Sequence, residues 1–371
     1  MKTLNIATTG AGAMARTHAY SAANLRYFYA DLPFEARLHT LCTRSPEKAE
    51  RAASTLGYAN HTTDEAEIMA NPDIDIIDIC TPNNCHFETI KAALAHGKHI
   101  YCEKPLVISS AQAAQLRPLM AKHPECICGV VFHNRFFPAV MRAKQLIESG
   151  QLGRILSFRF AYLHSSNLDT AKPAGWKQNK DVCGAGVLFD LGSHVLDLLV
   201  HLCGGIADVQ SSSQIAFPER AGADGAVWQT NAEEAIYITA KLGSGAVGTV
   251  EASKIALGTN DELTFRIWGT DGAVKFDLMQ PNYLEFFDGK DGAGTLGGDR
   301  GFKRIECVGR YDAPAGAFPS PKAPVGWLRA HMHSFYNFLD CVNRGVQPSP
   351  GFADGMYVQD VMERILAGTK W

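Results

Sequence analysis

Four polar side chains follow one another at helical spacing near the middle of the chain, and their types could move a proton. They are Asp190, His194, Asp197 and His201. At about 100° per residue they fall within roughly a 60° stripe of one helix, and mostly leucines occupy a separate apolar face. A carboxylate beside an imidazole fixes the imidazole tautomer and raises its basicity. We therefore predict that Asp190 and His194 can remove the proton of a substrate hydroxyl group.

Two other interpretations of this stripe are open. The first is a polar helix face that lies in solvent and does no chemistry. The second is a metal site, because an i, i+4 pair of His and Asp can contribute two ligands. Four residues spread over three turns span too far for one ion, so we expect no metal here.

A second group of candidates follows two strand-like segments, 73–80 and 98–102. Thr81-Pro82-Asn83 follows the first segment, and Glu103-Lys104-Pro105 follows the second. Ligands of open parallel sheets lie beyond the carboxyl ends of the strands. A lysine anchored between a strand and a proline can point its ammonium into that crevice, where it polarises a substrate oxygen or shuttles a proton. The alternative for Lys104 is an ordinary surface lysine.

A glycine-rich turn near the N-terminus fits the dinucleotide fingerprint G-x-G-x-x-G/A with Gly10, Gly12 and Ala15. The turn follows strand-like residues 3–9 and opens a helical stretch that begins with Ala13 and Met14. The first glycine permits a tight turn, the second lets a pyrophosphate approach the backbone, and the small alanine leaves room for helix–strand packing. The alternative is a strand-to-helix turn without a ligand. The position at the start of an alternating domain favours dinucleotide binding.

The end of the second predicted strand, 36–43, indicates which nicotinamide cofactor binds. An acidic residue at this point accepts hydrogen bonds from the ribose 2′-hydroxyl and repels a 2′-phosphate. Here the strand ends in Thr43-Arg44-Ser45 and carries no acidic residue. The Arg44 guanidinium can donate two hydrogen bonds to a phosphate, and the two neighbouring hydroxyl groups can donate to it as well. We therefore predict NADP in preference to NAD. The alternative for Arg44 is a solvated surface charge, which would leave NAD as the cofactor.

The elements that must position these residues alternate between strand and helix over the first third of the chain. Strands are predicted at 3–9, 36–43, 73–80, 98–102 and 126–132, with helices at 46–53, at 89–96 and after Ser109-Ser110. Ser45 is expected to cap the helix that begins at Pro46. Strands spaced by helices of this length predict crossover units and a parallel sheet. The first domain, 1–127, is therefore predicted to be a Rossmann NAD(P)-binding domain.

The second predicted domain, 128–371, carries a different pattern. Strands are predicted at 155–163, 235–242, 246–254, 263–268 and 273–277. Short glycine-rich links between several of them are typical of hairpins, so this half should carry a mainly antiparallel sheet. A helix at 190–202 interrupts the sheet, a glycine-rich polar loop spans 291–300, and two helices close the chain at 327–344 and 354–367. The predicted fold class is α/β with two domains.

The composition excludes several classes of protein. A chain of 371 residues is too long for one ordinary core, which agrees with two domains. The net charge is −3 with both signs interspersed, so we expect neither a nucleic-acid partner nor a basic membrane-binding surface. Apolar stretches fall short of the roughly 20 residues of a membrane span, and the N-terminus lacks a secretory signal. The ten cysteines lie mostly in strand-like runs, which indicates reduced core thiols in a cytoplasmic protein.

Taken together, these motifs resemble those of the glucose–fructose oxidoreductase, inositol dehydrogenase and rhizopine-catabolism (GFO/IDH/MocA) family. The resemblance covers essentially the whole chain. It depends on Gly10-Ala11-Gly12, Thr81-Pro82-Asn83 with His86, Glu103-Lys104-Pro105 and the glycine-rich segment before Asp190, His194 and Asp197; smaller similarities are Arg135-Phe136 with Pro138, Gly150 with Leu152-Gly153, and Phe352 with Asp354-Gly355. One departure is Ala185, where the family often has a third glycine.

The resemblance implies a hydride-transferring oxidoreductase, built from a Rossmann domain and an α/β domain with a large open antiparallel sheet. It implies that Lys104 polarises the substrate hydroxyl and that His194, paired with Asp190, is the base. The expected substrate contacts are Lys104, Asp190, His194 and Asp197. Together with the residues discussed above, the expected cofactor contacts are Gly10, Gly12, Ala13, Met14, Thr43, Arg44, Thr81, Pro82, Asn83, His86, Glu103, Lys104, Arg135, Trp176 and Lys177.

Three histidine and aspartate positions outside this core have more than one interpretation. Asp197 is either a substrate ligand or a support for its neighbours, and His201 is expected to be structural. His331 lies among aromatic residues of the helix that begins at Trp327. We expect His331 to be a core histidine with satisfied hydrogen bonds rather than a substrate contact.

The expected substrate is a sugar, a cyclitol or a related polyol. Side chains that both donate and accept hydrogen bonds surround the predicted centre, and an arginine clamp for a carboxylate is missing. The resemblance also implies a homodimer or homotetramer formed through the open sheet. Two rivals remain: the reduction of another carbonyl or imine substrate, and a dinucleotide-binding regulator without catalysis. Such a regulator should lack Lys104 and the Asp190–His194 pair.

Overall fold

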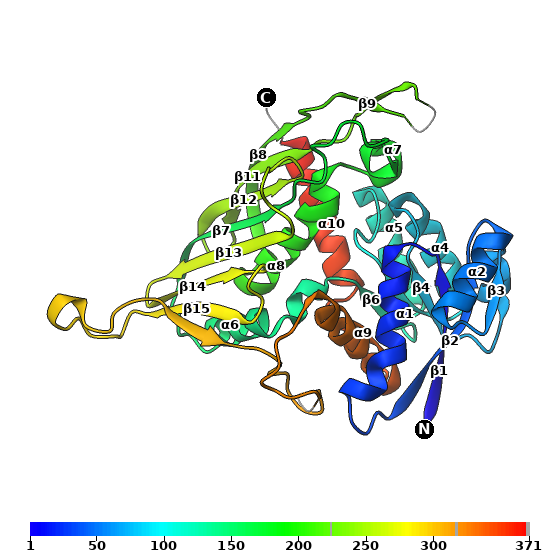
Figure 1. Cartoon of the computed structure of the whole chain (residues 1–371), viewed down its shortest axis with the longest axis horizontal. Helices are drawn as coiled ribbons and strands as arrows, with labels where there is room; N and C mark the ends of the chain where they lie inside the picture. Colours follow the sequence, from blue (N-terminus) through cyan, green and yellow to red (C-terminus); the bar gives the residue numbers. More distant parts are fainter. Residues whose placement is uncertain (223–224, 316–317, 369–371) are drawn as a thin grey trace. The chain divides into compact units, whose positions relative to one another are not determined.

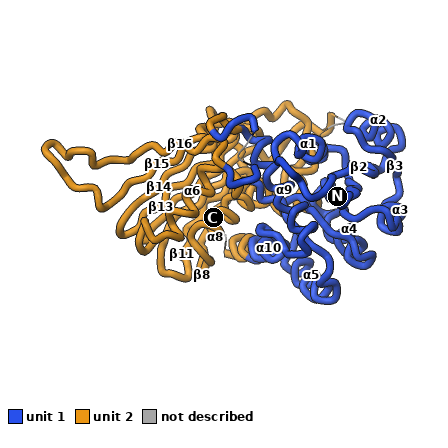
Figure 2. The backbone as a smooth tube through the Cα atoms, turned by 90° about the horizontal axis from the view of Figure 1, so that it is seen from below, with its two compact units in different colours: residues 1–133, 311–321, 326–360 blue, residues 134–310, 322–325, 361–371 orange. Residues whose placement is uncertain are grey.

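The computed structural model describes residues 1–222, 225–315 and 318–368, and it divides into two compact units (Figure 2). Unit 1 comprises Met1–His133, Tyr311–Pro321 and Gly326–Asp360; unit 2 comprises Asn134–Arg310, Lys322–Val325 and the chain from Val361 onward. The units are discontinuous in sequence, whereas the predicted domains, 1–127 and 128–371, were continuous. The difference arises because α9 (Trp327–Arg344), late in the sequence, packs against α1 (Ala13–Phe28) within unit 1.

The described part of unit 1 contains a sheet of six parallel strands in the order β3-β2-β1-β4-β5-β6. The strands are β1 (Lys2–Thr9), β2 (Phe34–Cys42), β3 (Asn60–Thr62), β4 (Ile76–Ile79), β5 (His99–Cys102) and β6 (Cys128–Val130). Every residue of β4 is buried, as in parallel strands that are covered on both faces. Parallel pairing aligns Thr9 with Ile79 and Ile79 with Cys102, so the segments that follow these strands begin at one edge of the sheet.

The helices of unit 1 begin where the sequence supplies caps. They are α1, α2 (Pro46–Leu56), α3 (Glu65–Ala70), α4 (Asn83–Ala95), α5 (Ser110–Lys122), α9 and the first part of α10 (Phe352–Ala367). Ser45 accepts a hydrogen bond from the Lys48 N–H at the start of α2, which confirms the predicted cap, and Ser109 caps α5 in the same way. The N-cap residues of α1 and α4, Gly12 and Pro82, form no side-chain cap.

The described part of unit 2 contains a sheet of eight strands in the order β16-β15-β14-β13-β7-β12-β11-β8. The strands are β7 (Ile155–Leu163), β8 (Ile206–Gln214), β11 (Ala235–Leu242), β12 (Val247–Ser253), β13 (Glu262–Gly269), β14 (Gly272–Asp277), β15 (Tyr283–Asp288) and β16 (Lys303–Glu306); β9 (Glu219–Ala221) and β10 (Val227–Gln229) form a separate hairpin. Pairing is antiparallel except between β12 and β7 among the described strands. This sheet confirms the predicted mainly antiparallel architecture.

Helices cover one face of the large sheet. α6 (Pro138–Glu148) packs on β14 and β15, and α8 (Ser193–Cys203) packs on β7 and β12 (Figure 1). From its second residue, β11 alternates buried and exposed positions, as expected for a strand with one packed and one open face. Four short turns complete the connections: η1 (His133–Phe136), η2 (Trp176–Gln178), α7 (Lys180–Cys183) and η4 (Thr295–Gly297).

The predicted helix 190–202 is instead two elements. A π-helical turn, η3 (Leu188–Gly192), precedes α8, and its wider hydrogen-bonding pattern shifts the register of the residues that follow. The segment Lys180–Cys203 also has the length and composition of a membrane span, contrary to our expectation that no segment would. In the structure, 83% of its apolar window is buried inside the protein, as in the core helix of a globular unit.

Candidate active site

The turn between β1 and α1 has the geometry that a pyrophosphate requires. Gly10 has a φ of 93°, and a Cβ atom there would lie 2.6 Å from the carbonyl oxygen of Cys80. A Cβ atom at Gly12 would meet no heavy atom within 4 Å, so the start of α1 is open on this side. Ala15 is fully buried, which agrees with the predicted need for a small residue. The open turn and the uncapped helix N-terminus fit a phosphate group.

A second observation supports a dinucleotide at this edge of the sheet. The Thr81 hydroxyl is buried, and it has no hydrogen-bond partner among the described residues. Thr81 follows β4 and lies next to the Gly10 turn, because its backbone nitrogen would be 3.2 Å from a Cβ atom at Gly10. Pro82 and Asn83 come next, at the uncapped start of α4. A buried polar atom without a partner requires one, and a bound dinucleotide can supply it.

The end of β2 differs in part from the prediction. Arg44 is exposed, as a residue that contacts a cofactor phosphate must be. The two hydroxyl groups beside it are already engaged: Thr43 donates to the Ser45 carbonyl oxygen at 3.1 Å, and Ser45 donates to Glu47 at 2.8 Å. These bonds correct the expectation that both hydroxyls act as extra phosphate donors. Of the three predicted groups, Arg44 alone has no hydrogen-bond partner among the residues that the structure describes.

His86 is the first predicted cofactor contact that the structure places elsewhere. Its side chain is fully buried, and its ring nitrogens lie 2.9 Å from the Pro105 carbonyl oxygen and 3.0 Å from the Thr81 carbonyl oxygen. Burial lowers the pKa of His86. The ring therefore ties the segment after β4 to the segment after β5, and the expectation of a cofactor contact is replaced by this supporting role.

Lys104 lies in a turn that the carboxylate of its neighbour Glu103 stabilises. The Lys104 backbone N–H donates to the Glu103 carboxylate at 3.1 Å, and the Lys104–Pro105 peptide bond is cis. Glu103 is buried, whereas Lys104 is partly exposed. The Lys104 ammonium also contributes to the lowered pKa of the buried His331 ring, after burial itself and two other histidines. The amine is therefore near enough to the His331 ring to disfavour its protonated form.

His331 is buried as predicted, but its hydrogen bonds are not satisfied. Its ring stacks on His133 with 3.6 Å between centroids and lies 4.1 Å from the Trp327 ring. Neither ring nitrogen has a hydrogen-bond partner among the described residues. Burial lowers the pKa of His331 well below its usual value, which keeps the ring neutral. The expectation of a satisfied core histidine is corrected on this point.

In unit 2, two ammonium groups hold the Asp190 carboxylate. Lys177 donates to both carboxylate oxygens at 2.8 and 2.9 Å, and the Lys254 ammonium lies 2.7 Å from one of them. Asp190 keeps 16% of its side chain exposed, and Lys254 only 6%. Asp190 lies in the π-turn η3, a kind of distortion that often marks functional sites. Its carboxylate is thus oriented by two ammonium groups and still accessible.

The glycine-rich segment before Asp190 is anchored by Glu233. The Glu233 carboxylate accepts hydrogen bonds from the Gly186 N–H at 2.8 Å and the Leu188 N–H at 3.0 Å. A Cβ atom at Gly186 would lie 2.0 Å from the Glu233 carbonyl oxygen, so this position requires glycine. Ala185, the departure from the family pattern, is buried and accommodated. This anchor sets where η3 begins and hence where Asp190 lies.

His194 lies in the first turn of α8, with its side chain largely buried. The Tyr162 ring meets it edge-on, with 6.0 Å between ring centroids. Tyr162 donates to Asp261 at 2.6 Å, and the His164 ring nitrogen lies 3.0 Å from the same carboxylate oxygen. Burial, together with Asp261, raises the pKa of Tyr162, so Tyr162 stays a hydrogen-bond donor. A fixed polar group therefore packs beside the predicted base.

Asp197, in the lower part of the predicted polar stripe, does not face solvent. Asp197 is 1% exposed and forms a buried ion pair with Arg135. In this pair the Asp197 carboxylate supports α8 from inside unit 2. The cofactor contact expected of Arg135 and the substrate contact expected of Asp197 stay predictions. His201, at the next turn, is partly exposed.

Trp176 and Lys177 are the remaining predicted contacts with the cofactor. Trp176 is 39% exposed, and the Lys177 ammonium lies 5.7 Å from the centre of its ring. Lys177 is bound to Asp190, and its expected contact with the cofactor stays a prediction. The dinucleotide turn, Glu103 and Lys104 belong to unit 1, and Asp190 and His194 belong to unit 2. That the two sets converge on one nicotinamide ring stays a prediction.

Sequence reasoning missed Lys254, Tyr162 and Asp261. Lys254 ends a predicted strand, the same signal that identified Lys104, and it was overlooked because no motif surrounds it. Tyr162 alternates with apolar residues along β7 and gave no sign of its partner. Asp261 reaches Tyr162 across 99 residues of sequence, a pairing that only the β7–β13 register creates.

Comparison with known proteins adds independent evidence. Residues 4–132 match the family model described as an oxidoreductase family with an NAD-binding Rossmann fold, and residues 140–275 match the GFO/IDH/MocA C-terminal domain. The chain is 31% identical over 379 residues to levoglucosan dehydrogenase of Pseudarthrobacter phenanthrenivorans, which covers 99% of this chain and 96% of that protein. It is 28% identical over 257 residues to the scyllo-inositol 2-dehydrogenase (NAD(+)) of Bacillus subtilis, with 67% and 69% of the two chains covered.

The same similarity extends to solved structures. The structure of levoglucosan dehydrogenase in complex with NADH and levoglucosan matches this chain with a TM-score of 0.94 and 31% identity. The match covers 99% of this chain and 97% of that one. The resemblance therefore reaches beyond motifs to both halves of the fold.

Proposed function

The chain belongs to the GFO/IDH/MocA oxidoreductase family, and from this premise we propose that it is an NAD(P)-dependent dehydrogenase or reductase of a sugar, a cyclitol or a related polyol. The reaction interconverts a carbinol and a carbonyl carbon. The observation that carries the proposal is the Asp190 centre, where two lysines hold an accessible carboxylate one turn before His194. Relatives that act, by name, on levoglucosan and scyllo-inositol support the polyol class.

The residues of unit 1 hold the dinucleotide in this proposal. The backbone at Gly10–Gly12 and the first N–H groups of α1 bind the pyrophosphate, with Ala13 and Met14 in the first turn. Thr81, Pro82, Asn83 and Glu103 line the strand edge toward the nicotinamide ribose. When bound, the nicotinamide supplies or accepts the hydride.

Proton transfer is assigned to Lys104 and to the Asp190 centre. The Lys104 ammonium polarises the substrate oxygen, and the His194 imidazole takes the hydroxyl proton as the carbinol is oxidised. Asp190, held by Lys177 and Lys254, orients the substrate and stabilises the imidazolium that forms at His194. Asp197 positions α8 through its ion pair with Arg135.

For the cofactor we propose NADP in preference to NAD. The support is the exposed Arg44 at the end of β2. The strand end carries no acidic residue that could bind the ribose 2′-hydroxyl. NAD is the second candidate, because the similar levoglucosan dehydrogenase structure holds NADH. The residue at position 44 separates the two.

We also propose that the protein works as a homodimer or homotetramer in the cytoplasm. The support is the open face of the large sheet, which carries both polar and aromatic side chains. Central positions on this face are Arg159, Tyr237, Thr249, Glu251 and Thr264. An open sheet face of mixed polarity suits a second copy of the same face.

The proposed function is tested with the purified full chain. Reduction of NADP and of NAD is followed with levoglucosan, L-sorbose, D-xylose and scyllo-inositol, for the wild type and for Lys104→Ala and His194→Ala. We expect turnover of at least one polyol, and a loss of about 100-fold or more in kcat/KM in each variant. His96→Gln, at an exposed helix end, is the matched control. Cofactor binding without turnover of any carbonyl or polyol would favour the regulator instead.

A further inference from the structure

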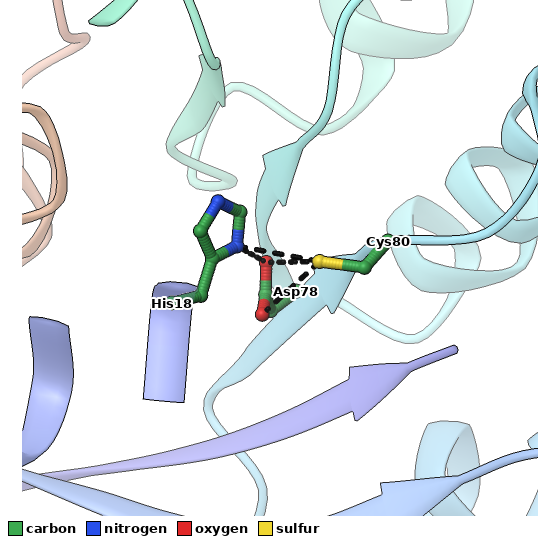
Figure 3. A group of neighbouring side chains, drawn as sticks. All are labelled: His18, Asp78 and Cys80. Carbon is green, nitrogen blue, oxygen red and sulfur yellow. Dashed lines mark hydrogen bonds and ion pairs between the residues drawn. The ribbon is translucent and has the colours of Figure 1, made fainter. Parts of the chain in front are cut away.

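A cluster of buried polar side chains lies behind the Glu103-Lys104 turn in unit 1. We call it the His18 cluster, and its members are His18 of α1, Asp78 of β4, Cys80 and Glu103. Figure 3 shows the His18 ring and the Cys80 sulfur turned toward the Asp78 carboxylate. His18 and Asp78 are 2% and 1% exposed. The dinucleotide fingerprint and the catalytic assignment use none of the first three.

His18 bridges two carboxylates. Its Nδ1 lies 2.8 Å from Asp78 Oδ1, and its Nε2 lies 3.3 Å from Glu103 Oε1. The second oxygen of Asp78 accepts a hydrogen bond from Thr8 at 2.9 Å, and Tyr58 in turn lies 2.6 Å from the Thr8 hydroxyl. The second oxygen of Glu103 accepts the Lys104 backbone N–H at 3.1 Å. A continuous chain of contacts thus leads from Tyr58 to Lys104.

The Asp78 carboxylate favours the protonated form of the His18 ring by raising its pKa. Burial acts to lower the pKa of His18, but the Asp78 carboxylate raises it well above 6.5. A neutral ring could donate at only one nitrogen and would leave two carboxylates buried close to each other, which is strongly unfavourable. A protonated ring donates to Asp78 through Nδ1, and its Nε2 forms an ion pair with Glu103 at 3.3 Å that lacks hydrogen-bond geometry.

The other titratable groups that face His18 are neutral. Burial raises the pKa of Cys80 to about 12, so the sulfur is a thiol. Burial likewise raises the pKa of Tyr101, whose ring lies 5.2 Å from that of His18, and the pKa of Tyr58. His331, 6.3 Å away on α9, has a lowered pKa. Asp78 and Glu103 are therefore the charged partners of His18 among the groups that surround it.

A metal ion is a weaker explanation of the same residues. His18, Asp78 and Cys80 could supply three ligand atoms, all within 4.8 Å of one another. Two ligands bound to zinc at about 2.0–2.1 Å in tetrahedral geometry would be about 3.3 Å apart. The observed separation of 2.8 Å between Nδ1 and Oδ1 is the length of a charge-assisted hydrogen bond between the two groups. The ring of Phe335, stacked at 5.9 Å, closes the cluster from α9.

We propose that His18 is a positioning residue that fixes the Glu103 carboxylate and, through it, the backbone that carries Lys104. The proposal rests on the proposed function, in which Lys104 polarises the substrate oxygen. Glu103 is held at one oxygen by His18 and at the other by the Lys104 N–H. Without the His18 contact, the carboxylate would turn away from Asp78, and the Lys104 turn would lose its anchor. A misplacement of about 1 Å at a reacting group can lower the rate about 100-fold.

Two neutral replacements separate the ends of the bridge. The amide of His18→Asn reaches the place of Nδ1, so it can contact Asp78 but not Glu103; the amide of His18→Gln reaches the place of Nε2 and can contact Glu103. We expect His18→Asn to lower kcat by about 10- to 100-fold and His18→Gln by about threefold or less, with cofactor Kd nearly unchanged in both. Because both variants lose the same charge, a general loss of stability affects them alike.

Three measurements decide the result. Equal kcat in the two variants, or losses that only follow their melting temperatures, would overturn the positioning role. Stoichiometric zinc in the wild type that disappears in His18→Asn would overturn it in favour of a metal site. His96→Gln is again the control, because His96 is exposed and contacts only its own helix among the described residues.

A readout that needs no turnover separates this proposal from the proposed function. Brief acetylation with acetic anhydride, followed by mass spectrometry of the peptides, reports the accessibility of Lys104 against exposed Lys122. We expect the ratio to rise about threefold or more in His18→Asn and to stay near the wild-type value in His18→Gln. If the wild type oxidises no polyol but the ratio changes as stated, the proposed function fails and the positioning role stands. An unchanged ratio in both variants contradicts the positioning role.

Discussion

The charged groups of the candidate site are buried or half-buried beside groups of opposite charge. Those neighbours determine what chemistry each group can do. Lys177 and Lys254 hold Asp190, Arg135 neutralises Asp197, and His18 stands between Asp78 and Glu103. Buried ion pairs contribute little net stability, but breaking one leaves an uncompensated charge that is costly. These pairs therefore act mainly by fixing where functional groups lie.

Cofactor choice is decided by a single side chain in our proposal. Arg44→Ala removes the exposed guanidinium group at the end of β2. The KM for NADP should therefore rise about tenfold or more, while the KM for NAD changes about twofold or less. Steady-state kinetics with both cofactors checks this. Equal changes in the two constants, or a wild type that prefers NAD, would show that Arg44 is only a surface charge.

The His18–Asp78 pair predicts how stability depends on pH. The pKa of His18 is raised in the folded state above its ordinary value of 6.5, so its stabilising contribution is fully present below pH 6.5 and is lost as the pH rises through the raised value. The melting temperature of the wild type should therefore fall as the pH is increased above 6.5. The double variant His18→Gln/Asp78→Asn lacks both charges and should show a flatter profile. Parallel profiles would contradict a charged His18.

At the scale of elements, the π-turn η3 shows how a local distortion creates a site. A regular helix over 190–202 would place Asp190, His194 and Asp197 on one continuous stripe. The π-turn ends at Gly192 and a regular helix begins at Ser193, so Asp190 meets two lysines while Asp197 points into the core. The distortion begins where Glu233 anchors the glycine-rich segment.

A substitution in this anchor should therefore affect both folding and activity. Gly186→Ala would place a Cβ atom 2.0 Å from the Glu233 carbonyl oxygen, and we expect a loss of about 1–3 kcal/mol in the free energy of unfolding, together with lower kcat. Denaturant titration measures the first effect. Gly301→Ala, where a Cβ atom would meet no heavy atom within 4 Å, is the matched control. Equal stability of the two variants would refute the anchor.

At the scale of the whole molecule, the two units divide the work. Unit 1 carries the dinucleotide turn, the Lys104 turn and the His18 cluster, whereas unit 2 carries the Asp190 centre. Among the described residues of unit 2, exposed side chains of β7, β12 and β11 lie on one face of its large sheet. We propose this face as the surface for assembly.

Assembly through this face can be broken by one charge. Thr249 on β12 is exposed and pairs in register with Arg159 on β7, so Thr249→Arg sets two cations side by side. In a symmetric interface each copy would bring the same pair, and the repulsion should shift the protein toward monomers. Light scattering after size-exclusion chromatography measures the mass. An unchanged oligomer, or a wild-type monomer, would rule out this interface.

Much of the architecture could be read from the sequence by itself. The strands 155–163 and 235–242 and the helix 327–344 were predicted with the bounds that the structure shows, because strict alternation and helical periodicity are local properties. The dinucleotide turn was equally local, since one glycine with positive φ and one small residue define it. Strands such as β8 and β16 were missed because polar, exposed residues interrupt their pattern.

Only the tertiary structure decided which polar groups meet. Asp190 with Lys254, Tyr162 with Asp261, and His18 with Glu103 join segments that are 64 or more residues apart in the chain. No local pattern encodes such pairs, because they arise when strand order and helix packing bring distant side chains together. The sequence by itself therefore determined the class of protein and the positions of its motifs, and folding determined the charge environment that gives those motifs their chemistry.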